Sequence, residues 1–153
     1  MADNFLVFNA AEAIQYADVV KGTYYFEAVI PTAPTASDVR IWGLYSKNRD
    51  LGLYFEITGT TFRAVVKDGN KDKIVTSEMT FETSWVGVPI EYKIIWDAGS
   101  AEFYVDRVHK CTLSFADDDI ALATEPLSLY IRNGNSDNML VGTMVAKNVF
   151  QYL

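Results

Sequence analysis

The sequence predicts an all-β protein built from two layers of strands. Apolar and polar residues alternate with a period of two in short runs, whereas helical periodicity is hard to find anywhere. About eleven such runs fit into the chain, too many for one open sheet of this length without curling or splitting. We therefore expect a two-sheet antiparallel sandwich, formed as a single domain over residues 1–153.

Residues that favour turns divide the first part of the chain. Pro31 and Pro34 end a first run at 23–30, because proline cannot continue a strand ladder. A four-residue turn of Lys, Asn, Arg and Asp then separates runs at 39–46 and 51–58. These observations predict three strands joined by a loop and a turn.

The middle of the chain continues as a meander. Residues 57–79 hold two further runs, and the Asp-Gly and Gly-Asn steps at 67–72 favour the left-handed conformations of a hairpin. Gly87 and Pro89 then interrupt the alternation, so we expect residues 80–90 to cross from one sheet to the other.

The last part of the chain also reads as strands separated by turns. Residues 91–115 read as three strands with turns at 97–100 and 106–107, and 116–125 read as a loop with one helical turn. The final strands follow. The runs at both ends of the chain predict termini that lie side by side in one sheet.

The composition limits the classes of partner that we expect this protein to bind. A net charge of −7 argues against nucleic acid and against an anionic membrane surface, since both need a cationic footprint. The start of the chain lacks a basic segment followed by an apolar one, so we expect synthesis in the cytoplasm without a signal peptide. No stretch has the length of apolar sequence that a membrane span requires.

The chain has one cysteine and one histidine, which lie close in sequence. Cys111 is expected to share a strand face with Leu113 and Phe115 as a small core residue. His109 is two residues before it and could lie on the same face. Without a third partner, this pair does not predict a nucleophilic site.

Two segments carry a family resemblance, which covers about Gly22 to Leu153. They are "YKIIWDAGSAEFYVDRV" and "PLSLYIRNGNSDN", and their matching residues are Trp96, Glu102 to Asp106 and Pro126 to Asn133. This sequence resembles the concanavalin-A-like superfamily, which includes legume lectins, laminin-G-like domains and laminarinase-type glycosidases. The resemblance implies a concanavalin-A-like jelly-roll β-sandwich, a frame that carries many functions.

The sequence departs from that superfamily at two points. Arg107 stands where the hairpin usually has glycine, so we expect either steric strain or an altered turn. The Glu-x-Asp-x-x-Glu motif of the glycosidase members is missing, and Glu102 and Asp106, roughly 13 Å apart along a strand, are the nearest acidic pair. We therefore expect no catalytic residues and no enzymatic activity, because glycoside hydrolysis needs two carboxyl groups held closer together.

Alternation also predicts which residues face outward. If Leu53 and Phe55 are buried, Tyr54 and Glu56 are exposed, and Arg40 turns its face outward because a lone arginine resists burial. The same reasoning gives an outer set with four aromatic and four charged residues: Trp42, Tyr54, Tyr104, Tyr130, Arg40, Glu56, Glu102 and Arg132. This set suits a sugar, which offers a C–H face and a rim of hydroxyls, and it also suits a protein interface. Aromatic residues that only cover the sheet or pair across strands are a third interpretation.

Cofactors are not expected. Asn133, Asn135 and Asp137 alternate as oxygen ligands of calcium do, and 117–119 add three aspartates, but both segments also have ordinary turn compositions.

The sequence therefore predicts a non-enzymatic module that works by surface contact. A virion accessory piece, such as a phage head-decoration or tail protein with protein subunits as partners, is the first hypothesis. A carbohydrate-binding, lectin-like module is the alternative, and a glycoside hydrolase is a third, less favoured hypothesis.

Overall fold

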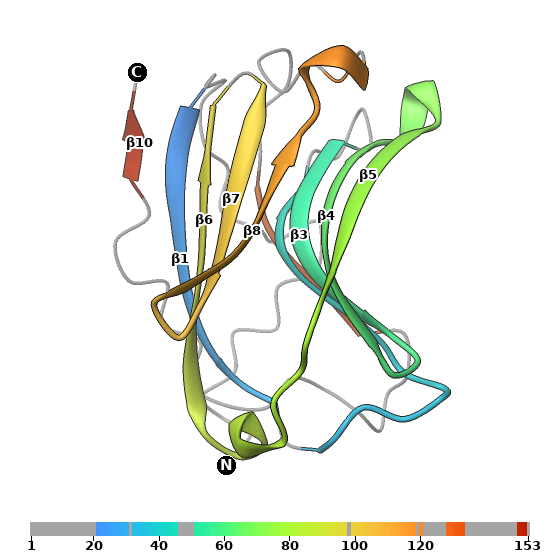
Figure 1. The fold of residues 1–153 in the computed structure, drawn as a ribbon, viewed down its shortest axis with the longest axis vertical. Coiled ribbons are helices and arrows are strands. Elements are labelled where there is room, and N and C mark those ends of the chain that lie inside the picture. Colours follow the sequence, from blue (N-terminus) through green and yellow to red (C-terminus); the bar gives the residue numbers. More distant parts are fainter. Residues whose placement is uncertain are drawn as a thin grey trace.

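The described residues form two five-stranded sheets packed face to face (Figure 1). The computed structural model describes residues 21–30, 32–45, 51–97, 99–118, 120, 128–133 and 150–152. Sheet A has the order β5 (Lys73–Met79), β4 (Thr61–Asp68), β3 (Leu51–Thr58), β2 (Val39–Tyr45) and β9 (Ser128–Asn133). Sheet B has the order β10 (Phe150–Tyr152), β1 (Lys21–Val29), β6 (Pro89–Trp96), β7 (Ser100–Val105) and β8 (Val108–Ser114).

All of the paired strands run antiparallel, which confirms the predicted two-sheet sandwich. Two meanders supply most of it, β2 to β5 in sheet A and β6 to β8 in sheet B. Short 3-10 turns lie at Gly69–Lys71, Thr83–Trp85 and Ala116–Asp118. No helix among the described residues is long and apolar enough to span a bilayer.

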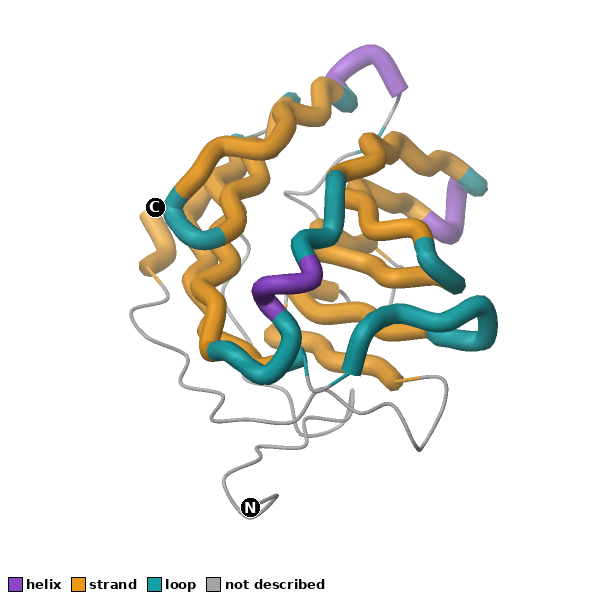
Figure 2. Tube along the Cα trace, turned by 60° about the horizontal axis from the view of Figure 1, so that its bottom comes forward, coloured by secondary structure: helices purple, strands orange, loops and turns teal. Residues whose placement is uncertain are grey.

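The segment between β5 and β6 crosses from sheet A to sheet B, as its glycine and proline predict. Figure 2 shows this path, with the Thr83–Trp85 turn lying between the two layers. The Trp85 ring is buried there and meets Phe62 and Phe81 edge to face. The crossing therefore closes one end of the core with aromatic side chains.

The apolar residues that alternate along the strands of both sheets form one continuous core between the sheets. At its centre the Trp42 ring stacks on Phe55 and Phe62, with ring centroids 5.8 and 5.9 Å away, and meets Tyr92 edge to face. Trp42 is 0% exposed, so its prediction as an outward residue is wrong. Because β2 carries apolar residues on both faces, alternation alone did not decide which one is buried.

The same prediction was wrong for Arg40, and the reason is a partner two residues earlier. The Arg40 Nη2 atom lies 2.8 Å from Asp38 Oδ2, and both side chains are fully buried. Arg40 also donates hydrogen bonds to the backbone oxygen and the hydroxyl of Thr32, each at 3.0 Å. A buried charge is tolerated when it is paired and hydrogen-bonded. Burial lowers the pKa of Arg40, and the Asp38 carboxylate opposes that shift.

The hairpin between β7 and β8 keeps its two-residue turn despite the missing glycine. Asp106 and Arg107 have φ values of 51° and 67°, as a type I′ turn requires. The expected alteration of the turn is therefore wrong, and the alternative, steric strain at Arg107, is what the backbone shows.

A β-bulge follows in β8 and separates His109 from Cys111. Cys111 pairs with the buried Phe103, whereas His109 pairs with Tyr104 on the outward face. The expectation that the two could share a face is wrong because the register shifts between Phe103 and Tyr104. Cys111 is half-buried against the core, as predicted.

The C-terminal strand β10 pairs with β1 at the edge of sheet B. The predicted N-terminal strand lies outside the described residues, so the pairing of the two ends stays a prediction.

Candidate functional site

The outward face of sheet A is concave, because β3 and β4 bow toward sheet B (Figure 1). Strand register arranges its residues in three rows that run across β5, β4, β3 and β2. The rows are Ile74, Lys67, Gly52 and Tyr45; then Thr76, Val65, Tyr54 and Gly43; then Glu78, Arg63, Glu56 and Ile41. We call these twelve residues the concave face.

The floor of the concave face is apolar. Ile41, Tyr54 and Val65 form a buried cluster separate from the main core, and Tyr45 packs against it. A Cβ atom at Gly52 would lie 2.7 Å from the Tyr54 ring, so only glycine lets that ring lie against the sheet. Tyr54 is therefore only 3% exposed and presents little more than an edge.

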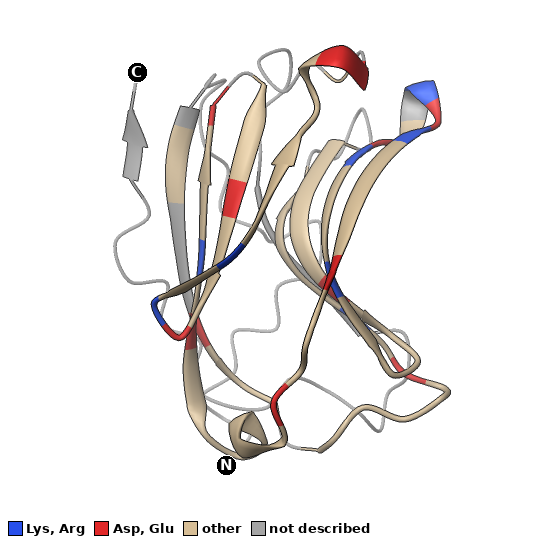
Figure 3. Ribbon diagram, viewed as in Figure 1, with Lys and Arg blue, Asp and Glu red and all other residues tan. Residues whose placement is uncertain are grey.

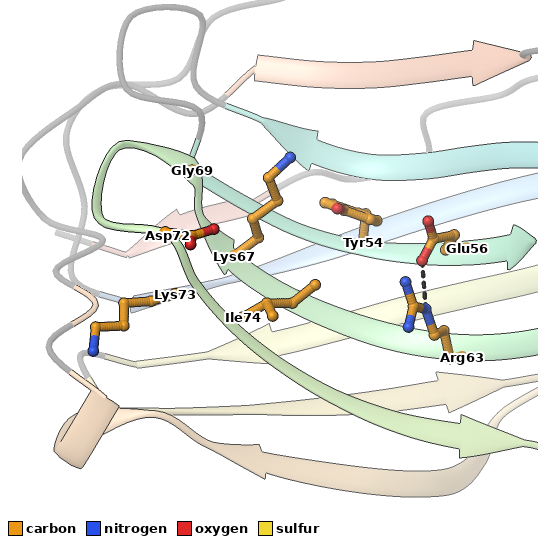
Figure 4. A pocket seen from close by; sticks show the side chains of 8 residues that line it. All are labelled: Tyr54, Glu56, Arg63, Lys67, Gly69, Asp72, Lys73 and Ile74. Atoms are coloured by element: carbon orange, nitrogen blue, oxygen red, sulfur yellow. Dashed lines mark hydrogen bonds and ion pairs between the residues drawn. The ribbon is translucent and has the colours of Figure 1, made fainter.

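A hollow of about 250 Å³ opens above this floor, toward β4 and β5. Figure 4 shows the side chains that line it, which come from β3, β4, β5 and the hairpin between the last two. The lining residues are Tyr54, Glu56, Arg63, Lys67, Gly69, Asp72, Lys73 and Ile74. Polar and charged groups therefore surround a small apolar area.

One wall of the hollow is an ion pair across β3 and β4. Arg63 Nε donates to Glu56 Oε2 at 2.5 Å, with the dashed line in Figure 4 marking the contact. The Arg63 side chain is 31% exposed and the Glu56 side chain 11%. The pair fixes a planar carboxylate and a planar guanidinium, both of which keep further hydrogen-bonding capacity.

The opposite wall is the hairpin that joins β4 to β5. Lys67 lies beside Tyr45, with its Nζ 3.4 Å from the tyrosine hydroxyl and 5.7 Å from the ring centroid. Asp72 has a φ of 52° and turns the chain into β5, where Lys73 and Ile74 follow. In Figure 3 this hairpin carries basic and acidic segments close together.

The structure brings together only part of the predicted outer set. Tyr54 and Glu56 lie on the outward face as predicted, but the prediction that they are exposed is wrong: Tyr54 is 3% and Glu56 9% exposed, because Tyr54 packs against Ile41 and Val65 and Glu56 pairs with Arg63. Tyr130 and Arg132 of β9 are in register with Gly43 and Ile41 beside them. The side chains of β9 lie outside the described residues.

Tyr104 and Glu102 belong to β7 in sheet B, on the opposite side of the sandwich, so the predicted set is not one surface. There the Tyr104 ring lies 4.2 Å from Lys93 Nζ and 5.3 Å from the centroid of His109. Tyr104 is thus held by cross-strand neighbours, as the third interpretation expected for an outer aromatic residue.

Sequence reasoning missed Arg63, Lys67 and Ile74. The signal was present in the loop length: Gly59 and Thr60 alone connect β3 to β4, and that short loop places Glu56 directly opposite Arg63.

The concave face carries two acidic residues, Glu56 and Glu78. Glu56 and Glu78 are two strands apart, roughly 9.6 Å by strand spacing, and Arg63 lies between them in the register. Among the residues the structure describes, no group of acidic, histidine or cysteine side chains is arranged to hold a metal ion. Of the residues considered for calcium, Asp117 and Asp118 are exposed in the Ala116–Asp118 turn, and Asp119 and the Asn133–Asp137 side chains lie outside the described residues.

No family model and no curated protein sequence matches this chain. Solved structures do match. Sheep galectin-11 in complex with glycerol aligns with a TM-score of 0.58 at 10% identity, over 91% of this chain and 95% of the galectin. The receptor binding domain of botulinum neurotoxin C/D mosaic serotype gives a TM-score of 0.59 at 14% identity, over 80% of this chain and 31% of that domain.

The catalytic domain of an endo-1,3-beta-glucanase (laminarinase) from Thermotoga petrophila RKU-1 gives a TM-score of 0.58 at 14% identity, over 78% of this chain and 53% of that domain. The chain thus spans nearly all of the galectin but about a third of the toxin domain and about half of the glucanase domain. These similarities confirm the concanavalin-A-like jelly-roll fold.

Proposed function

We propose that the protein is a non-catalytic, carbohydrate-binding module whose binding site is the hollow on the concave face. The observation that carries this proposal is the Glu56–Arg63 pair, which holds planar donors and acceptors at the wall of an open hollow. A sugar needs both features, because its hydroxyls hydrogen-bond in defined directions while its C–H face stays apolar.

The apolar part of that recognition comes from Ile74. Its side chain is 54% exposed and faces the hollow in Figure 4, where the Tyr54 edge lies near it. We infer that a sugar ring lies between the ion pair and Ile74, with its hydroxyls toward Glu56 and Arg63.

The named activities of the structural neighbours support a binding role and leave catalysis open. One is a galectin in complex with glycerol, one is a receptor binding domain, and one is a catalytic domain of a glucanase. We favour binding without hydrolysis because Arg63 lies between the two nearest acids of this face, where a scissile bond would have to lie.

A glycan array followed by titration tests the proposal. We expect wild-type protein to bind at least one glycan class and to release no reducing sugar from it. Replacing Ile74→Gln removes the apolar wall and should weaken binding several-fold. Val108→Gln is a matched control, because Val108 is also 54% exposed but lies on the edge strand of sheet B.

Equal loss of binding in both variants would contradict the assignment of the site to the concave face. No binding by the wild-type protein to any glycan would contradict the function. The virion setting and the cytoplasmic location stay predictions, with no support from the described residues or from the structural neighbours.

A further inference from the structure

The Arg63 guanidinium has donors left over after it pairs with Glu56. The ion pair uses Nε, and no described residue accepts a hydrogen bond from the two terminal nitrogens, Nη1 and Nη2. In Figure 4 these terminal nitrogens lie on the side of Arg63 that borders the hollow. Glu56 therefore acts as a positioning residue that fixes the plane of a free guanidinium fork.

The charge around the hollow is close to balanced, on a chain that is strongly acidic. Arg63 and Lys67 bring two positive charges to it and Glu56 and Asp72 two negative ones, whereas the Lys73 side chain extends away from the hollow in Figure 4. The protein as a whole carries a net charge of −7. Balanced surroundings on an acidic protein lower the electrostatic cost of bringing an anionic ligand to that place.

The geometry of the Arg63 guanidinium indicates which kind of anion it would bind. Two parallel N–H groups of arginine match the two oxygens of a carboxylate, which gives a short, charge-assisted and directional contact. Lysine cannot reproduce this arrangement because its ammonium acts as a point charge.

We propose that the hollow selects an acidic saccharide whose carboxylate is bound by the Nη1 and Nη2 atoms of Arg63. The inference rests on the proposed function and names its ligand class. Arg63 and Lys67 are four residues apart on β4, roughly 13 Å along the strand. That length suits an oligosaccharide, with the acidic ring at Arg63 and the next ring over the neighbouring side chains of Ile74 and Lys67.

Matched ligands test the inference directly. We would titrate the protein calorimetrically with oligosaccharides that end in galacturonic, glucuronic or N-acetylneuraminic acid, each beside its methyl ester, which keeps the size and removes the charge. At least one acid should bind about tenfold more tightly than its ester at low salt. The preference should shrink as salt is added, because the side chains are partly exposed.

Matched variants place the effect at Arg63. Arg63→Lys keeps the charge and a partner for Glu56 but loses the fork, so the preference for acid over ester should fall by most of its value. Lys67→Met should lower it less. Arg107→Lys, at an arginine on sheet B whose side chain is 83% exposed, is the control and should leave the preference unchanged.

The outcomes separate the two proposals. If neutral glycans bind but no acid exceeds its ester, the acidic-ligand inference is wrong and the proposed function stands. If sulfated glycans bind and carboxylates do not, the inference is also wrong, since a general cationic patch would explain the result. If no glycan of any class binds, both proposals fail.

Discussion

Removing Asp38 should cost far more stability than its position in a loop suggests. Asp38 Oδ2 accepts from Arg40 Nη2 at 2.8 Å and from the Thr35 backbone N–H at 2.7 Å, and both charged side chains are fully buried. Asp38→Asn keeps the shape and an acceptor for Thr35 but leaves the guanidinium without its countercharge. Breaking one half of a buried pair costs about 3–5 kcal/mol. For a domain of this size that loss lowers Tm by roughly 6–20 °C.

A double-mutant cycle separates pairing from burial. Arg40→Met alone leaves the buried Asp38 carboxylate without the positive charge of Arg40, so it should cost a similar amount. The double variant, Asp38→Asn with Arg40→Met, buries no charge and should lose only about 1–2 kcal/mol from the missing hydrogen bonds. The coupling free energy between the two sites, measured by urea unfolding, should therefore exceed about 2 kcal/mol.

The exposed pair of Arg107 and Glu91 is the control for this cycle. Its atoms are 3.7 Å apart, with the side chains 83% and 30% exposed, so its coupling should be about 0–0.5 kcal/mol. If the Asp38 and Arg40 substitutions prove additive, the buried pair contributes no specific stabilisation and the reasoning is refuted.

Four further predictions concern single positions. Arg107→Gly should raise stability by about 1 kcal/mol in chemical unfolding, because glycine adopts a φ of 67° without steric cost; a destabilised variant would contradict the strained turn. Trp42→Ala should lower stability by about 3–5 kcal/mol, and a near-native Tm would argue against its central place in the core. Burial raises the pKa of the Cys111 thiol, so its alkylation, followed by mass spectrometry, should be slower at pH 8 than in the unfolded chain. Hydrogen bonds from the Gly99 and Ser100 backbone lower the pKa of Asp97, so the turn contributes stability above pH about 4 that is lost as pH falls further; Asp97→Asn should flatten this acid dependence.

The sequence predicted the layered fold because strand alternation is a local property. Residues 100–105 alternate between buried and partly exposed positions, and residues 51–57 alternate between the core face and the concave face although all of them are buried. The structure places Leu53, Phe55 and Phe103 in the core accordingly. Turn residues also marked the hairpins. The two-layer fold and its hairpins could therefore be predicted from the local sequence pattern alone.

The prediction of which strand face is buried was wrong in two situations. In one, the contact that buries a residue comes from outside the strand; in the other, the strand register changes. Arg40 is buried because Asp38, at the end of the preceding loop, lies on the same side and pairs with it, and Trp42 follows Arg40 inward. His109 and Cys111 separate because a bulge adds a residue between them. Neither a loop conformation nor a bulge is visible in a period-two pattern.

On the concave face, the length of the β3–β4 loop determines which residues pair, although the sequence analysis did not use it. The loop of Gly59 and Thr60 pairs Thr58 with Thr61, and Gly59 supplies the positive φ of 61° that such a tight connection needs. From that one register Glu56 must lie opposite Arg63. A one-residue insertion here that shifts the register of β4 against β3, as read from cross-strand amide contacts, would move Arg63 to the core face of β4 or unpair it from Glu56. Such an insertion should therefore abolish saccharide binding in the titration even where circular dichroism shows the sheets intact, and retained binding would mean that the Glu56–Arg63 pair does not define the site.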